Sequence, residues 1–401
     1  MVLIGTDGTK TVTTPDGTET KEVRGPDPRW GMQSSAGQTV NVTTPGQRKL
    51  AVGSDRKATL ADTSDPFSVT SIVDTTTING RHYTRTYRVL SDTATRTTTD
   101  ETPEGRPAIR TLDPRGRVVK VQVGEVLPVC YGYDDQGRLE TITRGTGPDI
   151  RSFTFTYDAA GYLETITDPL RYTTGFSYDE AGRVKTMTRP DGKVVGYSFD
   201  ANGNLSSLTP SGRPSHAFPD FTPVNLISEY DPPDVDGMPD DETFYKYTKD
   251  RQLRQITGPE GTTVVAGYDP PSGRLDTLTL PNGQVVRFTY YPNSGNLKSI
   301  TTLDEIGLSY SYDGSLLTSE AWSGTIAGTV SRAYNDDLRV FSQSINDAHT
   351  IDYPPDNDGL PKAAGKLVLH RDPIRVCMPG CLPAPHSVIS TTCESTTTLA
   401  R

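Results

Sequence analysis

The chain has 401 residues, of which 33% are hydrophobic and 22% charged, and its formal net charge is −10. The low hydrophobic content argues against a compact globular enzyme, and the acidic balance without a basic stripe argues against nucleic acid or an anionic membrane surface as a partner. No run of about 18 apolar residues occurs, so we expect no membrane span.

The residue types favour strands and turns over helices. Gly (37), Pro (31) and Tyr (19) are abundant, Thr-rich stretches recur, and no long stretch has the apolar spacing of an amphipathic helix. Disorder is the other interpretation of so polar a chain, but regularly spaced Tyr, Leu and Ile argue against it in the middle of the sequence. We therefore expect an all-β protein.

Residues 1–110 show no clear repeat. They contain turn signals at Thr6-Asp7-Gly8-Thr9 and Pro15-Asp16-Gly17-Thr18, and Thr-rich stretches at 75–77 and 97–99. We expect irregular β structure that caps a repeat array or begins it. The first residues lack the basic region and long apolar core of a secretory signal, so the chain is either cytosolic or part of a longer exported protein.

Residues 111–360 repeat with a period of about 21 residues. The markers are aromatic-Asp pairs at Tyr133, Tyr157, Tyr178, Phe199, Tyr268 and Tyr312, the weaker Tyr247, Tyr291, Tyr334 and Tyr353, and Leu112-Asp113 as one more unit. Residues that recur in every copy are better explained by structure than by catalysis, because ten copies of one tyrosine are not ten active sites.

Each unit predicts a β-hairpin. In Tyr157-Asp158-Ala-Ala-Gly161, Asp158 can begin a type I turn and Gly161 can close it with a positive φ. Half a unit later a Pro-x-Gly turn follows, as in Pro190-Asp191-Gly192. Two strands of six to eight residues per unit would therefore chain into one antiparallel meander.

Leu139 and Ile142 are three residues apart, and so are their counterparts in other units. Strict strand alternation would put the two on opposite faces, whereas a bulge after the glycine would bring them to the same face. A ribbon with one half-apolar face can bury it by curling into a spiral in which each turn rests on the last.

These copies resemble the YD-repeat family, also called the RHS-repeat family. Its signature is a Tyr-Asp pair, a glycine turn and a short Leu/Ile/Thr strand, as in Tyr157-Asp158-Ala-Ala-Gly161-Tyr-Leu163-Glu-Thr-Ile166-Thr. The resemblance implies a spiralling β-ribbon around a hollow interior, here a partial YD shell. Bacterial members often enclose a C-terminal toxin segment, and the animal relatives, the teneurins, display the shell outside the cell.

The resemblance further implies a function and a location. We expect a non-enzymatic scaffold, part of a shell that would encapsulate or carry its own or a downstream effector segment, outside the cell or at its surface. Toxin-carrying members end in a self-cleaving core motif rich in Asp, Gly and Pro. Nothing after the last repeat matches that motif, so neither self-cleavage nor toxin activity is carried over to this chain.

Two acidic stretches interrupt or follow the repeats. Residues 223–243 form a Pro-rich insert within the double step between Phe199 and Tyr247, and Asp356-Asn-Asp358-Gly359 is a second such loop. Oxygen-rich loops can bind calcium, but the EF-hand spacing fails, so we expect solvated surface loops and no metal.

Residues 361–401 diverge from the repeats. After Arg371-Asp372-Pro373 the chain loses its aromatic residues and gains Cys377, Cys381 and Cys393. We hypothesise that the ancestral reading frame was lost near residue 373, with a natural low-complexity tail as the alternative, and expect disorder beyond about residue 374.

No catalytic, cofactor-binding or metal site is predicted. The five histidines are scattered, no phosphate-binding loop or nucleophile elbow occurs, and Cys130, beside Tyr131 in a predicted strand, is expected to be buried. The alternative function is a binding module for surface glycans or receptors. Its candidate sugar-stacking residues are Tyr131, Tyr162, Tyr172 and Tyr291.

Overall fold

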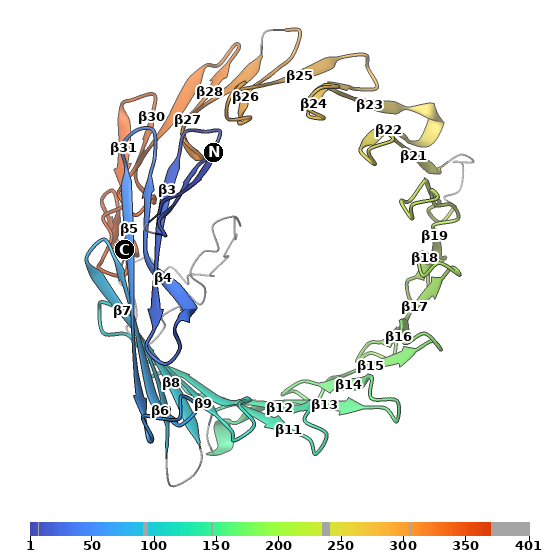
Figure 1. Ribbon diagram of the computed structural model, residues 1–401. Helices are drawn as coiled ribbons and strands as arrows, with labels where there is room; N and C mark the ends of the chain where they lie inside the picture. Colours follow the sequence, from blue (N-terminus) through green and yellow to red (C-terminus); the bar gives the residue numbers. More distant parts are fainter. Residues whose placement is uncertain (7, 91–94, 146, 235–240, 305, 370–401) are drawn as a thin grey trace.

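The computed structural model describes residues 1–6, 8–90, 95–145, 147–234, 241–304 and 306–369. They form a single-layered antiparallel meander in which consecutive strands pair, and the ribbon curls into a ring around a hollow centre (Figure 1). The all-β fold class and the spiralling ribbon are confirmed.

Residues 1–110, for which we expect irregular structure, contain long paired strands. Most of them are longer than the strands of the repeats, and they pair in register with the repeats in one 19-stranded sheet. The strands are β1 (Val2–Ile4), β2 (Lys10–Thr13), β3 (Glu19–Asp27), β4 (Gly31–Thr43), β5 (Lys49–Leu60), β6 (Val69–Ile78), β7 (Arg81–Val89), β8 (Arg96–Glu101) and β9 (Pro107–Leu112).

The first repeats complete this sheet. Their strands are β10 (Val118–Val123), β11 (Val129–Tyr133), β12 (Leu139–Arg144), β13 (Arg151–Tyr157), β14 (Leu163–Thr167), β15 (Thr173–Tyr178), β16 (Val184–Thr188), β17 (Val194–Phe199), β18 (Leu205–Thr209) and β19 (His216–Ala217). A 3₁₀ turn, η1 (Gly147–Asp149), joins β12 to β13.

The later repeats form a 12-stranded sheet. Its strands are β20 (Glu229–Tyr230), β21 (Thr243–Tyr247), β22 (Leu253–Thr257), β23 (Thr263–Tyr268), β24 (Leu275–Thr279), β25 (Val285–Tyr290), β26 (Leu297–Thr301), β27 (Gly307–Asp313), β28 (Leu316–Ser323), β29 (Gly328–Tyr334), β30 (Val340–Ile345) and β31 (His349–Asp352), with the 3₁₀ turn η2 (Pro259–Gly261) between β22 and β23. A small hairpin of β32 (Ala363–Ala364) and β33 (Leu367–Val368) follows.

The insert at 223–243 joins the two sheets, so it is not the solvated loop that we expected. The backbone NH groups of Ala217 and Asp231 donate to each other's carbonyl oxygens at 2.8 and 2.9 Å, which keeps the ribbon continuous. Asp241 is buried. The double step in the repeat therefore holds a shortened hairpin, β19–β20. Residues 235–240 of the insert lie outside the described part.

The bulge expected in each unit is confirmed. Tyr133 pairs with Leu139 and Tyr131 with Ile142, and the register shifts between Gly132 and Tyr133. The extra residue, Glu140, restores Leu139 and Ile142 to one face, shared with both tyrosines. The strands of these repeats, five to seven residues from β11 to β18, are slightly shorter than predicted.

Each unit is fastened to the one before it by its repeated aromatic residue. The hydroxyl of Tyr157 donates to the Leu139 carbonyl at 2.7 Å, and the Arg138 guanidinium lies 4.3 Å from the centre of the Tyr157 ring. Asp134 accepts from the Arg138 Nε at 2.7 Å, which holds that guanidinium in place. The same hydroxyl-to-carbonyl bond is made by Tyr133, Tyr178, Tyr247, Tyr268, Tyr290 and Tyr334.

One repeat marker was misassigned. Tyr290, not Tyr291, donates to the preceding unit, at the carbonyl of Leu275. Tyr291 takes the place of the turn aspartate, since its backbone NH bonds the carbonyl of Asn296 as that of Asp134 bonds Arg138.

A ribbon one strand-layer thick has almost no core. Ala108 is the only hydrophobic residue in the described ranges that is buried, and apolar side chains elsewhere are half-buried against cross-strand neighbours. Cys130 is exposed, so its predicted burial was wrong: in β11 it alternates with Tyr131 and pairs with Lys120 and Thr143 on the polar face.

We expect Tyr157→Phe to lower the free energy of unfolding by about 1 kcal/mol, the net value of one hydrogen bond between protein groups. Urea titration followed by circular dichroism measures this change. The matched control is Tyr172→Phe, because Tyr172 is 56% exposed and its hydroxyl bonds no described residue. Equal effects of the two substitutions would show that the hydroxyl-to-carbonyl bond does not fasten the units.

Candidate functional site

No cluster of three or more potential metal ligands occurs among the described residues, and none of their helices is long and apolar enough to cross a membrane. Two features arise instead from tertiary contacts that the sequence did not predict. One is the seam where the ring closes on itself. The other is a cleft rich in arginine on the inner side of β5.

The turns of the meander alternate between two rims of the ribbon. The aspartate rim carries the turns that follow each repeat aromatic, such as 134–138, 158–162, 335–339 and 356–360. The proline rim carries the opposite turns, including 44–48, 79–80 and 102–106. The ring closes where the proline rim of the first strands meets the aspartate rim of the last repeats (Figure 1).

At one end of the seam the Thr44-Pro45 turn binds the carboxylate of Asp313. The Thr44 hydroxyl donates to Asp313 Oδ2 at 2.7 Å, and the Gly46 backbone NH donates to Oδ1 at 2.5 Å. Both oxygens of Asp313 are therefore engaged by one turn. A Cβ at Gly46 would lie 2.6 Å from Asp313 Oδ2, so a larger residue at this position would require the carboxylate to shift.

At the other end a second Thr-Pro turn repeats the arrangement. The Thr102 hydroxyl donates to Asp358 Oδ2 at 2.9 Å, and the Glu104 NH donates to Oδ1 at 3.0 Å. Arg106 adds ion pairs to Asp358 and, at 2.9 Å, to Asp356. Asp358 is only 5% exposed, so the carboxylate is paired in a largely desolvated position.

Between the two Thr-Pro turns, the β6–β7 turn meets the turn at 335–339. Asn79 donates to Asp337 at 2.7 Å, and Arg81 pairs with the same carboxylate. The Lys49 backbone NH donates to Asp336 at 3.3 Å. The end of the ribbon thus contacts the beginning of the ribbon, as expected for a spiral. The contact is made by polar residues at the two rims and not by an apolar face of the sheet.

The seam corrects the expectation that Asp356-Asn-Asp358-Gly359 is a solvated loop. Its aspartates bind protein donors about 250 residues earlier in the chain. Asp337 and Asp358 hold the third position of their docking turns, where earlier units have Gln136, Ala160, Ala181 and Asn202. Asp250 holds the same position in the turn 248–252, outside the seam, so this position alone does not identify a docking turn. The receiving turns begin with Thr-Pro at 44–45 and 102–103.

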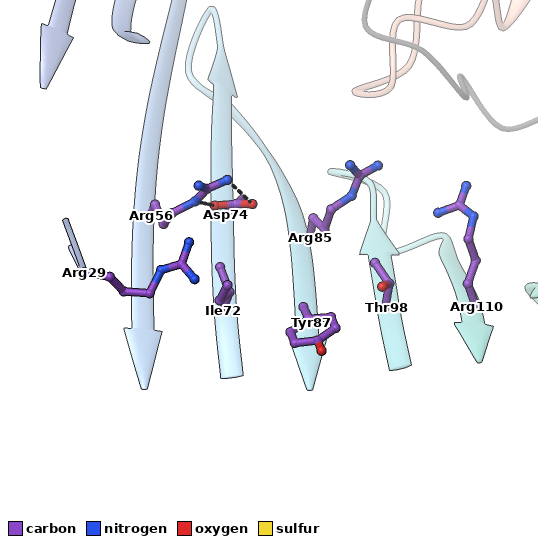
Figure 2. A pocket seen from close by; sticks show the side chains of 8 residues that line it. All are labelled: Arg29, Arg56, Ile72, Asp74, Arg85, Tyr87, Thr98 and Arg110. Carbon is purple, nitrogen blue, oxygen red and sulfur yellow. Dashed lines mark hydrogen bonds and ion pairs between the residues drawn. The ribbon is translucent and has the colours of Figure 1, made fainter. Parts of the chain in front are cut away.

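The second feature is a row of alternating charge across five strands. In register, Arg56 on β5 faces Asp74 on β6, Asp74 faces Arg85 on β7, and Arg85 faces Asp100 on β8. Arg56 contacts Asp74 through two nitrogens at 2.5 and 3.0 Å (Figure 2), and Arg85 contacts Asp100 at 2.5 Å. Arg110 on β9 also pairs with Asp100.

The distal part of the β3–β4 hairpin leaves the sheet and covers this row from the inner side of β5 (Figure 1). Asp27, at the end of β3, is 4% exposed and pairs with Arg56 at 3.2 Å and with Arg29 at 3.4 Å. The space between hairpin and sheet has a volume of about 750 Å³ and adjoins a more open cavity of about 590 Å³, shown in Figure 2.

The charges of the cleft stabilise one another's ionised forms. Burial by itself raises the pKa of Asp27, but the backbone NH of Arg29 and the Arg56 guanidinium outweigh it and hold that pKa below its usual range. Asp100 behaves alike: burial opposes ionisation, and bonds from Arg85 and Arg110 lower its pKa overall. The hydrogen bond to Asp74 raises the pKa of Arg56.

The four tyrosines considered for sugar stacking are not gathered in one place. Tyr131 is half-buried in β11, and Tyr162 stacks on Tyr178 with ring centres 4.8 Å apart. Tyr172 is 56% exposed in the β14–β15 turn. The Tyr291 hydroxyl donates to the Tyr310 carbonyl at 2.9 Å.

A closed, hollow β-ribbon built from repeated hairpins defines the class of shell-forming repeat proteins. Residues 6–364 match the family described as Teneurin YD-shell, and the chain belongs to that family. The resemblance to YD-repeat proteins is thereby confirmed. Among curated proteins, none matches the sequence closely.

Solved structures with a similar ribbon come from toxin complexes. The chain is similar to a protein of the Photorhabdus luminescens Tc holotoxin pore, with 14% identity and a TM-score of 0.47 over 89% of this chain and 21% of that one. It is also similar to TcdB2-TccC3, with 11% identity and a TM-score of 0.37 over 87% of this chain and 27% of that one. The chain thus spans about a quarter of the length of these structures.

We expect Asp358→Ala to open the seam. Removing one partner of a buried ion pair costs about 3 kcal/mol, because Arg106 and the Thr102 hydroxyl lose their acceptor. Small-angle X-ray scattering should show a larger radius of gyration, and hydrogen exchange should accelerate at the Glu104 and Arg106 amides.

The matched control is Asn202→Ala, which changes the third position of an equivalent turn outside the seam. It should leave both measurements unchanged. An Asp358→Ala protein with the scattering profile of the wild type would contradict the role given to the seam.

We expect the thermal stability of the protein to fall below about pH 4. Burial raises the pKa of Asp356, but the Leu360 NH and the Arg106 guanidinium lower it further, so the folded-state pKa lies below the unfolded value near 3.9. A depressed folded pKa contributes stability that is present above pH 4 and is lost as pH falls toward that folded pKa. Asp27 and Asp100 act in the same direction.

Melting temperatures measured from pH 7 to pH 3 check this expectation. Arg106→Gln should lower the melting temperature at neutral pH and make the decline at acid pH shallower, whereas Arg254→Gln, an exposed arginine of the repeats, should change neither. A rise in stability on acidification would contradict the assignment.

Proposed function

We propose that this chain is a non-enzymatic scaffold whose ring forms part of a shell that encapsulates or carries an effector segment. The shell or scaffold role follows from membership in the YD-shell family. That the shell encloses an effector is what we propose beyond this family role. Its partner would be its own or a downstream effector segment of a longer parent protein.

The observation that carries the proposal is the closure of the ring. Five aspartates at the aspartate rim, Asp313, Asp336, Asp337, Asp356 and Asp358, bind donors of the proline rim. These bonds close the ribbon into a ring (Figure 1). Such a ring suits one turn of a container wall, to which a longer parent protein would add the turns that separate an enclosed segment from proteases outside.

Location and chemistry are parts of the same proposal. A carrier of this kind acts outside the cell or at its surface as part of an exported protein. The repeated Tyr, Asp and Arg side chains bond one another between units, which supports a structural role for them and not a catalytic one.

The alternative is a binding module for surface glycans or receptors. Tyr172 supports it, because this side chain is 56% exposed at a turn and offers a ring face to a sugar. Its support is smaller, since Tyr162 and Tyr291 are engaged with Tyr178 and Tyr310. Glycan-array binding that Tyr172→Ala abolishes would favour this function.

We expect protection of the segment encoded with this chain. The first step is to sequence the coding locus on both sides and translate all frames beyond codon 373. Where further repeats lead into an unrelated domain, the whole parent protein is digested with trypsin, with and without Asp358→Ala. The domain should resist digestion in the wild type and be cleaved at least tenfold faster in the variant, because the variant opens the wall.

Asn202→Ala in the same parent protein is the control and should protect the domain like the wild type. A domain that is cleaved equally fast in all three proteins would refute enclosure. Flanks that hold neither further repeats nor another domain would refute the carrier role and leave the binding module as the preferred function.

A further inference from the structure

The cleft beneath the β3–β4 hairpin has the composition of a ligand site. Four arginines, Arg29, Arg56, Arg85 and Arg110, line its open cavity of about 590 Å³ together with Ile72, Asp74, Tyr87 and Thr98 (Figure 2). This concentration of guanidinium groups occurs in a protein whose net charge is −10. It lies on the inner side of β5, where an enclosed segment would pass.

The four arginines of the cleft outnumber the carboxylates that pair with them. Asp27, Asp74 and Asp100 are the carboxylates that pair with the four guanidinium groups. Arg85 engages Asp100 through its Nε, and its side chain is 60% exposed. Its two Nη groups, which form the fork that binds carboxylates, bond no described residue and border the cavity. The cleft therefore has one positive charge and several N–H donors left for an anion.

An apolar row lies directly beside the charged one. Ala58 faces Ile72, Ile72 faces Tyr87, and Tyr87 faces Thr98 across β5 to β8. Figure 2 shows Ile72, Tyr87 and Thr98 below Asp74 and Arg85 on the same face of the sheet. A ligand that satisfies the arginines can thus place an apolar group on Ile72 and Tyr87.

The spacing of the arginines selects an extended ligand. Arg56 and Arg85 lie two strands apart, on β5 and β7, which corresponds to about 10 Å at the usual strand spacing. A single small anion does not span that distance. Carboxylates three residues apart in a polyproline II segment do, because that helix has three residues per turn and rises about 3.1 Å per residue, so both carboxylates project from the same side.

We propose that this cleft binds a polypeptide segment in the polyproline II conformation, with two acidic residues three positions apart and an apolar side chain between them. The carboxylates take the free fork of Arg85 and the Arg29–Arg56 or Arg110 end of the row, and the apolar side chain rests on Ile72 and Tyr87. The inference rests on the proposed carrier function, in which such a segment belongs to the enclosed effector.

The test is isothermal titration calorimetry of the full chain with a blocked peptide of sequence Gly-Glu-Phe-Thr-Glu-Gly. The glutamine counterpart, Gly-Gln-Phe-Thr-Gln-Gly, should bind at least tenfold more weakly. Arg85→Gln should reduce affinity for the acidic peptide at least tenfold, and Arg85→Lys, which keeps the charge and removes the fork, should reduce it less. Arg151→Gln, an exposed arginine of β13, is the control and should bind like the wild type.

Arg85→Gln is a suitable variant because Asp100 keeps Arg110 as its partner, and an unchanged melting temperature confirms that the fold persists. Equal binding of the two peptides, or unaltered binding by Arg85→Gln, would overturn the inference. Complete displacement of the peptide by inorganic phosphate at equal concentration would also overturn it, because a simple anion site would then suffice.

The two proposals fail separately. A parent protein that protects its effector domain although the peptide does not bind would refute the cleft and keep the carrier. Peptide binding without protection of the domain would refute enclosure and leave the cleft as a peptide site.

Discussion

A sheet one layer thick has no interior, so its shape depends on directional contacts between its turns. In this protein carboxylates make those contacts: Asp313 and Asp358 each accept from a threonine hydroxyl and a backbone NH of a Thr-Pro turn that lies 254 to 269 residues earlier in the chain. Because both oxygens of each carboxylate are engaged, the contact fixes position and orientation together. The hollow centre exists because the ribbon closes through its rims and no second layer covers its face.

Within the ribbon, regularity comes from contacts between neighbouring units. The hydroxyls of seven repeated tyrosines donate to a carbonyl of the preceding unit. At Tyr133, Tyr157 and Tyr290 an arginine of that unit also lies over the ring. Stability in such an array is the sum of many similar neighbour terms, as in other repeat proteins. The row of Arg–Asp pairs on β5 to β9 is not part of this repeating pattern, because the sequences of these strands do not repeat. The row also differs from the repeats in being covered by a hairpin.

Most of the repeat could be predicted from the sequence, because its information is local. Asp and Gly three positions apart set the turn, and the three-residue spacing of Leu139 and Ile142 required the bulge that is found between Gly132 and Tyr133. Prediction failed where a residue's surroundings depend on distant segments. Asp358 was predicted to lie in a solvated turn, because its partner Thr102 is 256 residues earlier in the chain and no local pattern connects the two. Cys130 was predicted to be buried beside Tyr131, but consecutive residues of a strand point to opposite faces, and Cys130 lies on the exposed one.

The sequence by itself determined the hairpin, the bulge, the period and the family, since each follows from backbone preferences and side-chain spacing within about 21 residues. Only the tertiary structure decided that the ring closes, and that Arg29, Arg56, Arg85 and Arg110 share one cleft. The physical reason is that the small twist and curvature of each unit accumulate along the ribbon. Which proline-rim turn meets which aspartate-rim turn is therefore a property of the whole path of the chain, and no local pattern encodes it.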